Sequence, residues 1–478
     1  MRDIYDFTGE ARPDSGEGSL KTFLWTEEPI RSGKALRKKV KRSALGEWKY
    51  TKDRDQVIAL IKQQEESRVQ ELLPIRHERM SATPFAFYRA AAIVMADDLS
   101  HTPDTGITVQ ACGDAHISNF GVFASPERRL VFDMNDFDET LPGPWEWDVR
   151  RLMTSVEICG RGRGFSGENR KEAILQASRI YREAMRSFSE TGNMALWYKH
   201  IDVAKFYREH AEEFEDNRGK NLERAAMKAL SKNSQEAVLK FTETIDGKTR
   251  IAHRPPLLVP LREIQKDPEY GSAADVKNAI ENAFNAYRKT LPRERRGLID
   301  QYHIVDVARK VVGVGSVGVR AWIIVMEGIS PEDPLVMQIK EAQESVLERY
   351  LVKSRFTEHG RRVIEGQRAI QTNSDILLGW TRLQTGSGVV RDYYIRQLWD
   401  AKGSVNLEKI SQEELTALAS MCAWTLAHAH AKTGNRHQIA GYLGKSEAFD
   451  HAMYEFARSY ADQNENDYEM FRKTIAQQ

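Results

Sequence analysis

Residues 112–148 read CGDAHISNFGVFASPERRLVFDMNDFDETLPGPWEWD, and the rest of the predicted fold is built around them. Asp114 and Asn119 lie five residues apart in a predicted loop, directly after a short strand predicted at residues 107–111. Residues 120–123 and 129–132 are predicted to form a hairpin, because the ASPER between them is typical of a turn. The acidic segment NDFDE follows at once, so two groups of polar side chains are expected to meet at the base of the hairpin.

This spacing meets the needs of phosphoryl transfer from ATP. A carboxylate must orient the attacking hydroxyl group, and oxygen ligands must hold the Mg²⁺ that bridges the phosphates. Kinases supply these groups as an Asp, an Asn five residues later, and a further Asp at the end of a hairpin. Asp133, Asp136 and Asp138 crowd three carboxylates into six residues, which is costly unless a cation or basic side chains lie nearby. Taken alone, NDFDE is equally typical of a turn that caps a helix.

GDAHISN resembles the GD-x-H-x-x-N loop of aminoglycoside and choline-type phosphotransferases, and NDFDETLPGPWEWD resembles their second acidic segment. The resemblance implies that Asp114 is the catalytic residue and that Asn119 and Asp136 bind the metal ion. Asp133 is the rival of Asp136, because it lies directly at the strand end. The residues with an implied supporting role are His116 in the loop, Asp138 in the acidic segment, and Asp148, whose carboxylate would tie the loop to a helix.

The chain also resembles, from about residue 50 to its end, a bacterial family of uncharacterised proteins. The signatures that carry this resemblance are SATPFAFYRAAA, CGDAHISNFG, FDMNDFDE, VVGVGSVGVR, QIKEA, EGQRAIQ and LAHAHAKTG. Ala91 departs from the pattern, where a Gly is expected, and the change is conservative. The resemblance implies kinship and leaves the reaction open.

Residues 313–318 read GVGSVG and form the pattern G-x-G-x-x-G. A dinucleotide-binding fold would need a helix after this pattern. Here VRAWIIVM follows, and its strand-forming residues predict strands at residues 311–318 and 319–326 around a glycine-rich turn. In kinases a loop of this type covers the phosphates, whereas a plain glycine-rich hairpin is the alternative. The expected nucleotide-binding residues of the loop are Gly313, Gly315, Ser316 and Gly318.

A strand predicted at residues 335–339 leads directly into Lys340. A lysine at this place can bind the α- and β-phosphates as a point charge, and it needs a glutamate from the next helix to fix it. Glu365 is the first candidate for that glutamate, and Glu344 and Glu348 are its rivals, since spacing does not decide among them.

Two more strands, at residues 376–384 and 389–398, complete a predicted sheet of five strands. A helical stretch at residues 341–374 is inserted after the third strand. The last strand would lead to a hinge, where backbone groups near Gln397 and Leu398 are expected to meet the adenine edge of the nucleotide.

The two halves of the expected site occur in reversed order, because the glycine-rich loop and lysine of kinases precede the catalytic loop. A circular permutation explains the reversal, since chain ends often lie close together. We therefore expect an α+β, circularly permuted protein-kinase-like fold with a small antiparallel sheet lobe and a large helical lobe. The expected parts are an irregular arm at residues 1–50, a helical lobe with the catalytic loop and hairpin at 51–300, a nucleotide-binding sheet lobe at 301–400, and helices returning to the large lobe at 401–478.

Composition narrows the function classes. The 478 residues carry a formal net charge of +1, which gives no overall field to attract nucleic acid or an anionic membrane. The three cysteines form no CxxC pair, no apolar leader follows the start, and apolar runs such as residues 321–326 are too short to span a bilayer. We expect a cytoplasmic protein with neither a membrane nor a nucleic-acid partner. The basic run at residues 31–42 is interpreted as a solvated arm.

The expected function is ATP- and Mg²⁺-dependent phosphotransfer to a hydroxyl group of a small molecule or protein that the sequence does not identify. AMP transfer or nucleotide hydrolysis would use the same residues, and a non-catalytic nucleotide-binding protein is a further alternative. A metal-dependent hydrolase would use Asp114, His116, Asp133 and Asp136 without any need for the glycine-rich loop and the lysine strand.

Overall fold

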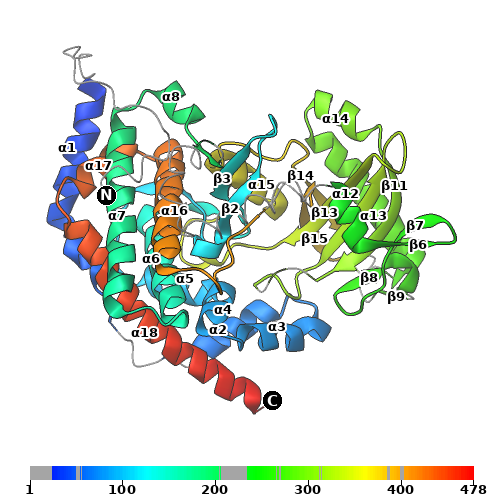
Figure 1. The fold of residues 1–478 in the computed structure, drawn as a ribbon, viewed down its shortest axis with the longest axis horizontal. Helices are drawn as coiled ribbons and strands as arrows, with labels where there is room; N and C mark the ends of the chain where they lie inside the picture. Colours follow the sequence, from blue (N-terminus) through cyan, green and yellow to red (C-terminus); the bar gives the residue numbers. More distant parts are fainter. Residues whose placement is uncertain are drawn as a thin grey trace.

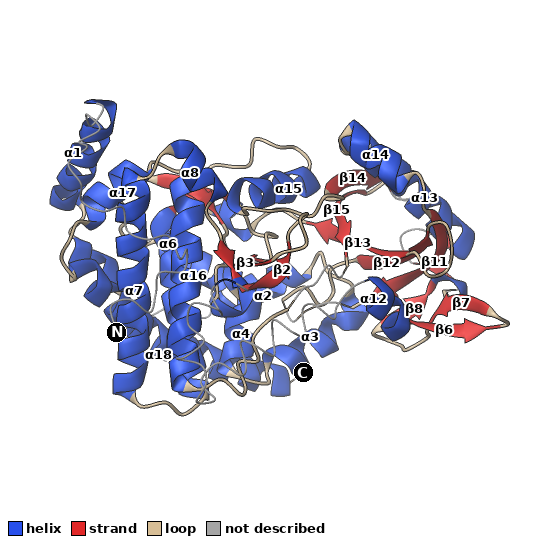
Figure 2. Cartoon of the chain, turned by 45° about the horizontal axis from the view of Figure 1, so that its top comes forward, coloured by secondary structure: helices blue, strands red, loops and turns tan. Residues whose placement is uncertain are grey.

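The computed structural model is an α+β fold in which helices gather in one part and an antiparallel sheet lies in another (Figure 1). The expected α+β class is thereby confirmed. The structure describes residues 24–49, 54, 56–203, 205, 234–264, 266–267, 271–311, 313, 315–384, 388–398 and 403–477. Figure 2 shows the same separation of helices and sheet from a second direction.

Long helices form the centre of the helical part, and α7 (Gly167–Glu190) lies beside α16 (Gln412–Thr433) although the two are far apart in the chain (Figure 1). α16 is rich in small and apolar residues and is buried on nearly all sides. The other helices of this part are α2 (Gln56–Glu65), α3 (Leu73–Met80), α4 (Pro84–Ala90), α5 (Ala92–Ser100), α6 (Trp145–Gly162), α8 (Asn193–Tyr198), α17 (Arg436–Leu443) and α18 (Ala448–Ala476).

α1 (Leu24–Lys39) lies where we expected an irregular, solvated arm, so that expectation is wrong for the described residues from 24 onwards. Arg37 Nε donates to the carbonyl of Tyr442 at 2.8 Å, and Arg42 Nη1 donates to that of Leu443 at 2.6 Å. Both carbonyls belong to the last turn of α17. The carbonyl groups of a last turn have no hydrogen-bond donors within their own helix, and this end of a helix attracts positive charge. The basic run therefore serves a packing contact that its own sequence does not reveal.

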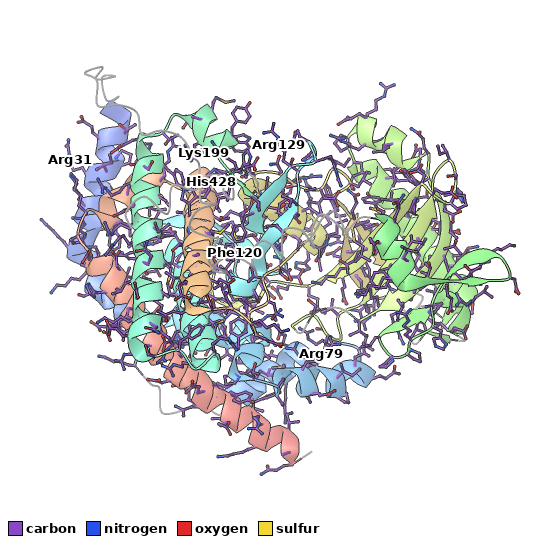
Figure 3. All side chains as sticks on the ribbon, viewed as in Figure 1. Arg31, Arg79, Phe120, Arg129, Lys199 and His428 are labelled. Carbon is purple, nitrogen blue, oxygen red and sulfur yellow. The ribbon has the colours of Figure 1, made fainter. Side chains whose placement is uncertain are left out.

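The predicted hairpin is present as β2 (Phe120–Ala124) and β3 (Leu130–Met134). The strand expected before it is β1 (Thr108–Ala111), and this strand pairs with β4 (Leu141–Pro144). Phe120 is buried within the helical part and lies close to α16 (Figure 3). Because β3 and β4 are fixed on either side of it, the NDFDE segment is held at both ends. β5 (Ile201–Asp202) also pairs with β3.

The large sheet has six strands in the described part of the chain, all paired antiparallel in the order β14-β15-β13-β12-β11-β8. Their bounds are β8 (Leu258–Pro260), β11 (His303–Lys310), β12 (Ala321–Glu327), β13 (Pro334–Ala342), β14 (Gly379–Gln384) and β15 (Val390–Gln397). Alternate residues of β12 face opposite layers. Trp322 and Ile324 pack on α13 (Ala273–Thr290), whereas Ile323 and Val325 pack on α12 (Ser234–Phe241).

Four of the five predicted strands occur in this sheet near their expected positions, and α15 (His359–Ile370) follows the strand expected third, as predicted. The first strand was misplaced, because β11 ends at Lys310, and the described residues 313 and 315–318 form a bend and a turn rather than a strand. The loop valines resemble a strand, since β-branched residues favour strands wherever they occur.

The stretch before residue 301 is less helical than expected. β8 belongs to the large sheet, and β6 (Thr242–Ile245) and β7 (Lys248–Ile251) form a separate hairpin. α12, α13 and the short α14 (Arg293–Ile299) also precede residue 301, and the first two pack against the sheet. A boundary at residue 301 therefore cuts through the sheet layer.

Within the part of the chain that the structure describes, no helix has both the length and the apolar character needed to cross a membrane. Cys112, Cys159 and Cys422 are buried free thiols, so none of them closes a disulfide.

Candidate functional site

A cleft of about 570 Å³ brings together residues from both parts of the molecule. This volume lies in the range of about 300–1,000 Å³ that is usual for small-molecule sites. The predicted site residues that line it are Asp114, His116, Asn119, Asp136, Asp138, Gly313, Gly315, Ser316 and Glu344. The acidic loop and the glycine-rich loop, about two hundred residues apart in the chain, therefore face one cavity.

The start of the acidic loop is held by Asp148 in the first turn of α6. Its Oδ2 accepts a hydrogen bond from Cys112 N at 2.7 Å, and its Oδ1 accepts one from Gly113 N at 2.9 Å. His430 on α16 lies 3.2 Å from Oδ2, and Tyr181 lies 2.8 Å from the other ring nitrogen of His430. Helices from three regions of the chain thus position the loop through one buried carboxylate.

Asp114 lies at the floor of the cleft, and its side chain is 23% exposed. Arg151 Nε donates to Asp114 Oδ1 at 2.6 Å, and His116 Nε2 lies 3.6 Å from Oδ2. Burial is the main cause that raises the pKa of Asp114 to about 7, and the charges of Asp136 and Glu139 act in the same direction, whereas Arg151 opposes them. A carboxyl group with a pKa near neutrality is suited to accept and return a proton.

Arg151 was missed by the sequence analysis. It lies on α6 one turn after Asp148, so both side chains reach the same loop. That spacing in WEWDVRRL was the signal that could have indicated it.

Asn119 and Asp133, both proposed as metal ligands, differ in orientation. Asn119 Nδ2 donates to the carbonyls of Asp114 at 2.9 Å and Asp136 at 3.0 Å, so its Oδ1 is the atom that could coordinate a cation. Asp133 does not line the cleft. Its oxygens accept from Met134 N at 2.8 Å and Thr372 N at 3.0 Å. Asp133 therefore fixes the chain beyond α15, and Asp136 is the carboxylate that faces the cleft.

Lys340 on β13 reaches across to the acidic segment and forms an ion pair with Asp138. Tyr394 on the neighbouring strand donates to the other oxygen of Asp138 at 3.0 Å. Burial alone would lower the pKa of Lys340, but the charges of Asp136 and Asp138 outweigh it, so the pKa is raised and the ammonium is retained. The lysine and the acidic segment therefore meet although 202 residues separate Asp138 from Lys340.

The glutamate expected to fix Lys340 is not where we predicted it. Glu365 lies 3.6 Å from Arg368 on its own helix, and Glu344 pairs with Lys353 at 2.9 Å. Glu348 accepts hydrogen bonds from Ser345 N and Ser354 N, at 3.3 Å and 3.1 Å. The acidic segment itself supplies the partner of Lys340, and sequence spacing could not reveal a partner from so distant a segment.

The expected hinge residues also lie apart from the cleft. Gln397 N donates to Asp375 at 2.6 Å, and Leu398 N donates to the carbonyl of Val336 at 2.9 Å. Both residues line a separate pocket of about 60 Å³, well below the usual size of a ligand site. Gln397 and Leu398 therefore lie outside the cleft that the acidic and glycine-rich loops share.

The glycine-rich loop is held by the helical part through three arginines. Arg68 Nη1 donates to the carbonyl of Val317 at 2.6 Å, and Arg76 Nη1 donates to that of Gly315 at 2.6 Å. Arg79, on the segment that reaches towards the sheet part, binds the carbonyl of Gly313 (Figure 3). Lone arginines in helical patterns give no signal in a sequence, so this contact could not be foreseen.

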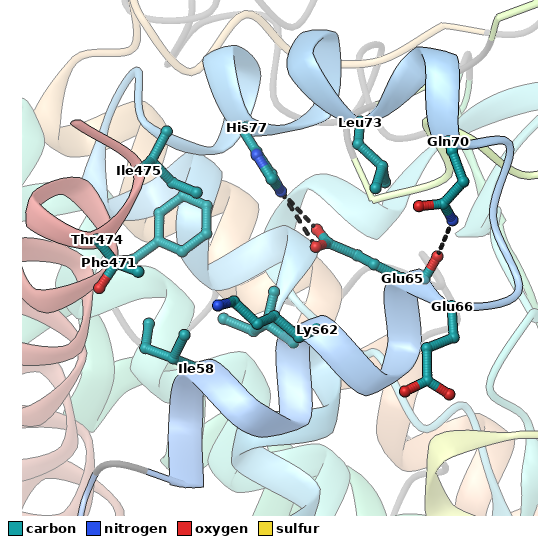
Figure 4. A pocket seen from close by; sticks show the side chains of 11 residues that line it. Ile58, Lys62, Glu65, Glu66, Gln70, Leu73, His77, Phe471, Thr474 and Ile475 are labelled. Carbon is teal, nitrogen blue, oxygen red and sulfur yellow. Dashed lines mark hydrogen bonds and ion pairs between the residues drawn. The ribbon is translucent and has the colours of Figure 1, made fainter. Parts of the chain in front are cut away.

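Arg76 is itself fixed by Glu65, whose Oε1 lies 3.1 Å from Arg76 Nε and 3.0 Å from His77 Nε2. Glu65 and His77, joined by this contact, line a second pocket of about 270 Å³ between α2, α3 and the end of α18 (Figure 4).

Among the described residues, no group of three or more His, Cys, Asp or Glu side chains is arranged to hold a metal ion by itself. Mg²⁺ bound with a nucleotide commonly needs only one or two carboxylates, because phosphate oxygens and waters complete its shell. Asp136 and Asn119 Oδ1 meet that smaller requirement.

Fold and cleft together define an α+β protein whose helical part and antiparallel sheet share a cleft with acidic and basic walls. A family model described as "Uncharacterized protein conserved in bacteria (DUF2252)" matches residues 68–474, so the chain belongs to that family. The resemblance to an uncharacterised bacterial family is thereby confirmed. No curated protein and no solved structure shows a match.

Proposed function

We propose that the protein is an ATP- and Mg²⁺-dependent phosphotransferase with a circularly permuted protein-kinase-like fold. The sheet part supports this, since β11, a glycine-rich loop, β12, the lysine strand β13 and then α15 follow one another in the order of a kinase nucleotide-binding lobe. The acidic loop that would complete the site precedes these elements in the chain, as a permutation requires.

The observation that carries the proposal is the meeting of Lys340 with the acidic segment. Lys340 does not itself line the cleft, but it pairs with Asp138, which lines the cleft together with Asp114, Asn119 and Asp136. A buried lysine and several carboxylates in one place are explained if they grip a charged ligand and its counter-ion.

Each residue has a role in this proposal. Asp114 orients the acceptor hydroxyl and takes its proton, and Arg151 fixes its carboxylate. Asp136 and Asn119 would hold Mg²⁺, and Lys340 would bind phosphate oxygens. The metal ion would neutralise charge that develops on the phosphates. The adenine base would not lie on the face of the sheet that carries Val336, because α12 packs against that face.

Thermal unfolding with ATP and Mg²⁺ tests the proposal. A ligand that binds only the folded state at a hundredfold excess over its Kd stabilises that state by about 3 kcal/mol, so the midpoint rises. Lys340→Met and Asp136→Asn should each weaken binding about tenfold to a hundredfold, because a charged hydrogen bond is lost. The matched control is Lys353→Met, since this lysine is 75% exposed and outside the cleft.

Asp114→Asn separates binding from turnover. We expect it to keep ATP affinity and to lose turnover by about 10²–10⁴-fold, the usual contribution of a general base. Labelled ATP then identifies the product as phosphoryl transfer, AMP transfer or hydrolysis. Unchanged midpoints of the wild-type protein with ATP and Mg²⁺ would sink the proposal and leave the hydrolase alternative.

A further inference from the structure

Two arginines that are buried or half-buried line the cleft without an acidic partner among the described residues. Arg68 and Arg89 both face it, and neither forms an ion pair with any residue that the structure describes. The Nε of each is buried and has no hydrogen-bond partner. Arg68 is only 6% exposed.

Burial acts against both charges. It lowers the pKa of Arg68 to about 9, together with the neighbouring charge of Arg76, although Glu139, Glu65 and Asp138 oppose the shift. It also lowers the pKa of Arg89, against the charges of Asp114 and Asp136. A buried guanidinium that lacks a partner is costly, and a bound anion removes that cost.

Both residues lie against the glycine-rich loop, Arg68 with its side chain and Arg89 with its backbone. Arg68 contacts the loop through the carbonyl of Val317, and the backbone oxygen of Arg89 lies 3.3 Å from the place where a Cβ of Gly315 would be. Asp114 and Asp136 lie close enough to act on the charge of Arg89, and Glu139 and Asp138 act on that of Arg68. An oxyanion in the cleft would therefore have guanidinium groups and the proposed metal ligands around it.

We propose that Arg68 and Arg89 form an anion subsite that binds the terminal phosphate of a polyphosphate. Anion binding stands on two guanidinium groups that have no acidic partner among the described residues and whose Nε atoms lack hydrogen bonds, whereas the identity of the polyphosphate as ATP rests on the proposed function. Guanidinium groups match phosphate oxygens in geometry, and an arginine supplied within the chain stabilises the charge of a transferring phosphoryl group. An anionic group on the acceptor is the other source of the same chemistry.

The first test needs no nucleotide. Inorganic tripolyphosphate without metal should raise the unfolding midpoint of the wild-type chain, and Arg68→Gln and Arg89→Gln should each abolish most of the shift. The control is Arg436→Gln, whose Nε is also buried without a partner but which lies outside the cleft. No shift in the wild-type chain, or an equal shift in all three variants, would overturn the proposal.

The second test assigns the phosphate. Arg89→Gln should weaken ATP binding at least about tenfold, the effect of a lost charged hydrogen bond, and should leave ADP binding nearly unchanged. An equal loss for ATP and ADP would overturn the assignment to the terminal phosphate and favour an anionic acceptor. If the wild-type chain binds tripolyphosphate but no nucleotide, the proposed function fails while the anion subsite stands.

Ligand-free stability distinguishes a binding role from a structural one. Arg89→Gln removes an unpaired buried charge, so its midpoint without ligand should equal or exceed that of the wild-type chain. A lower midpoint would mean that Arg89 serves packing, and the subsite would then have to be abandoned.

Discussion

At the scale of single residues, Glu146 is a carboxyl group that the fold keeps out of contact with water. It is fully buried in the first turn of α6, where Oε1 accepts from Thr105 N at 2.9 Å and Oε2 has no partner. Burial raises its pKa from 4.5 to about 7. Because the folded-state pKa is raised, the contribution of Glu146 to stability is complete below pH 4.5 and is lost as the pH rises through 7.

Glu146→Gln should remove this pH dependence. Between pH 5 and pH 8 the wild-type chain should lose about 2–3 kcal/mol of unfolding free energy that the variant keeps, because a pKa difference of one unit is worth about 1.4 kcal/mol. Urea unfolding at both pH values measures it. The exposed Glu190→Gln, at the end of α7, is the control and should follow the wild-type chain. The same pH dependence in Glu146→Gln and in the wild-type chain would refute the assignment.

At the scale of elements, sequence patterns predicted those strands and turns whose formation depends mainly on the residues within them. The β2–β3 hairpin and the strands around Lys340 follow from turn residues and β-branched runs, and the structure confirms them. α1 escaped prediction, because its high charge hid a helix that a contact with α17 stabilises. β11 was misplaced because its neighbouring loop is rich in valine, and β8 is too short to give a pattern.

The residues of the candidate site also divide into those that spacing in the sequence predicts and those that tertiary packing alone reveals. Asp114, Asn119 and Asp136 lie near one another in sequence, and their spacing was enough to predict that they share a cleft. The partner of Lys340 depends on tertiary packing. The pairing of Lys340 with Asp138 was therefore not foreseen, and the choice of Glu365 as its partner was wrong. Arginine contacts to backbone carbonyls of the glycine-rich loop leave no trace in spacing at all.

Gly113 sets the turn that carries Asp114, and it provides the prediction at this scale. Its φ is +81°, and a Cβ would collide with the backbone carbonyl of Glu139. Gly164 has a similar φ of +72° but open space around it. Gly164→Ala should cost about 1 kcal/mol for the left-handed backbone alone, and Gly113→Ala about 3 kcal/mol or more, since a backbone collision is added.

Urea unfolding of both glycine variants measures the difference. The loss of unfolding free energy beyond that of Gly164→Ala reports how tightly the acidic loop is packed against the NDFDE segment. Equal losses would show that the loop moves away from Glu139 at little cost, and the close packing described here would then be wrong.

At the scale of the whole molecule, Arg362 ties the sheet part to the acidic segment. It lies on α15 and is 2% exposed. Its Nη1 donates to the carbonyl of Thr140 at 2.7 Å, and its Nη2 donates to those of Asp138 at 2.7 Å and Gln343 at 2.8 Å. One guanidinium thus fixes the backbone on both sides of the ion pair between Asp138 and Lys340, so the two walls of the cleft are held at a set distance.

Arg362→Met should therefore lower the unfolding free energy by about 3–5 kcal/mol, because three buried carbonyls lose their donor and Glu348, 3.5 Å from Arg362 Nε, loses its nearest cation. Arg361→Met on the same helix is the control. Arg361 is exposed and lies over the rings of Phe356 and Trp380, so its loss should cost no more than about 1 kcal/mol. Hydrogen exchange should also become faster in residues 136–140 of Arg362→Met alone, since the acidic segment is then released from the sheet part. If both variants lose the same free energy and residues 136–140 stay equally protected, the two parts are joined by other contacts.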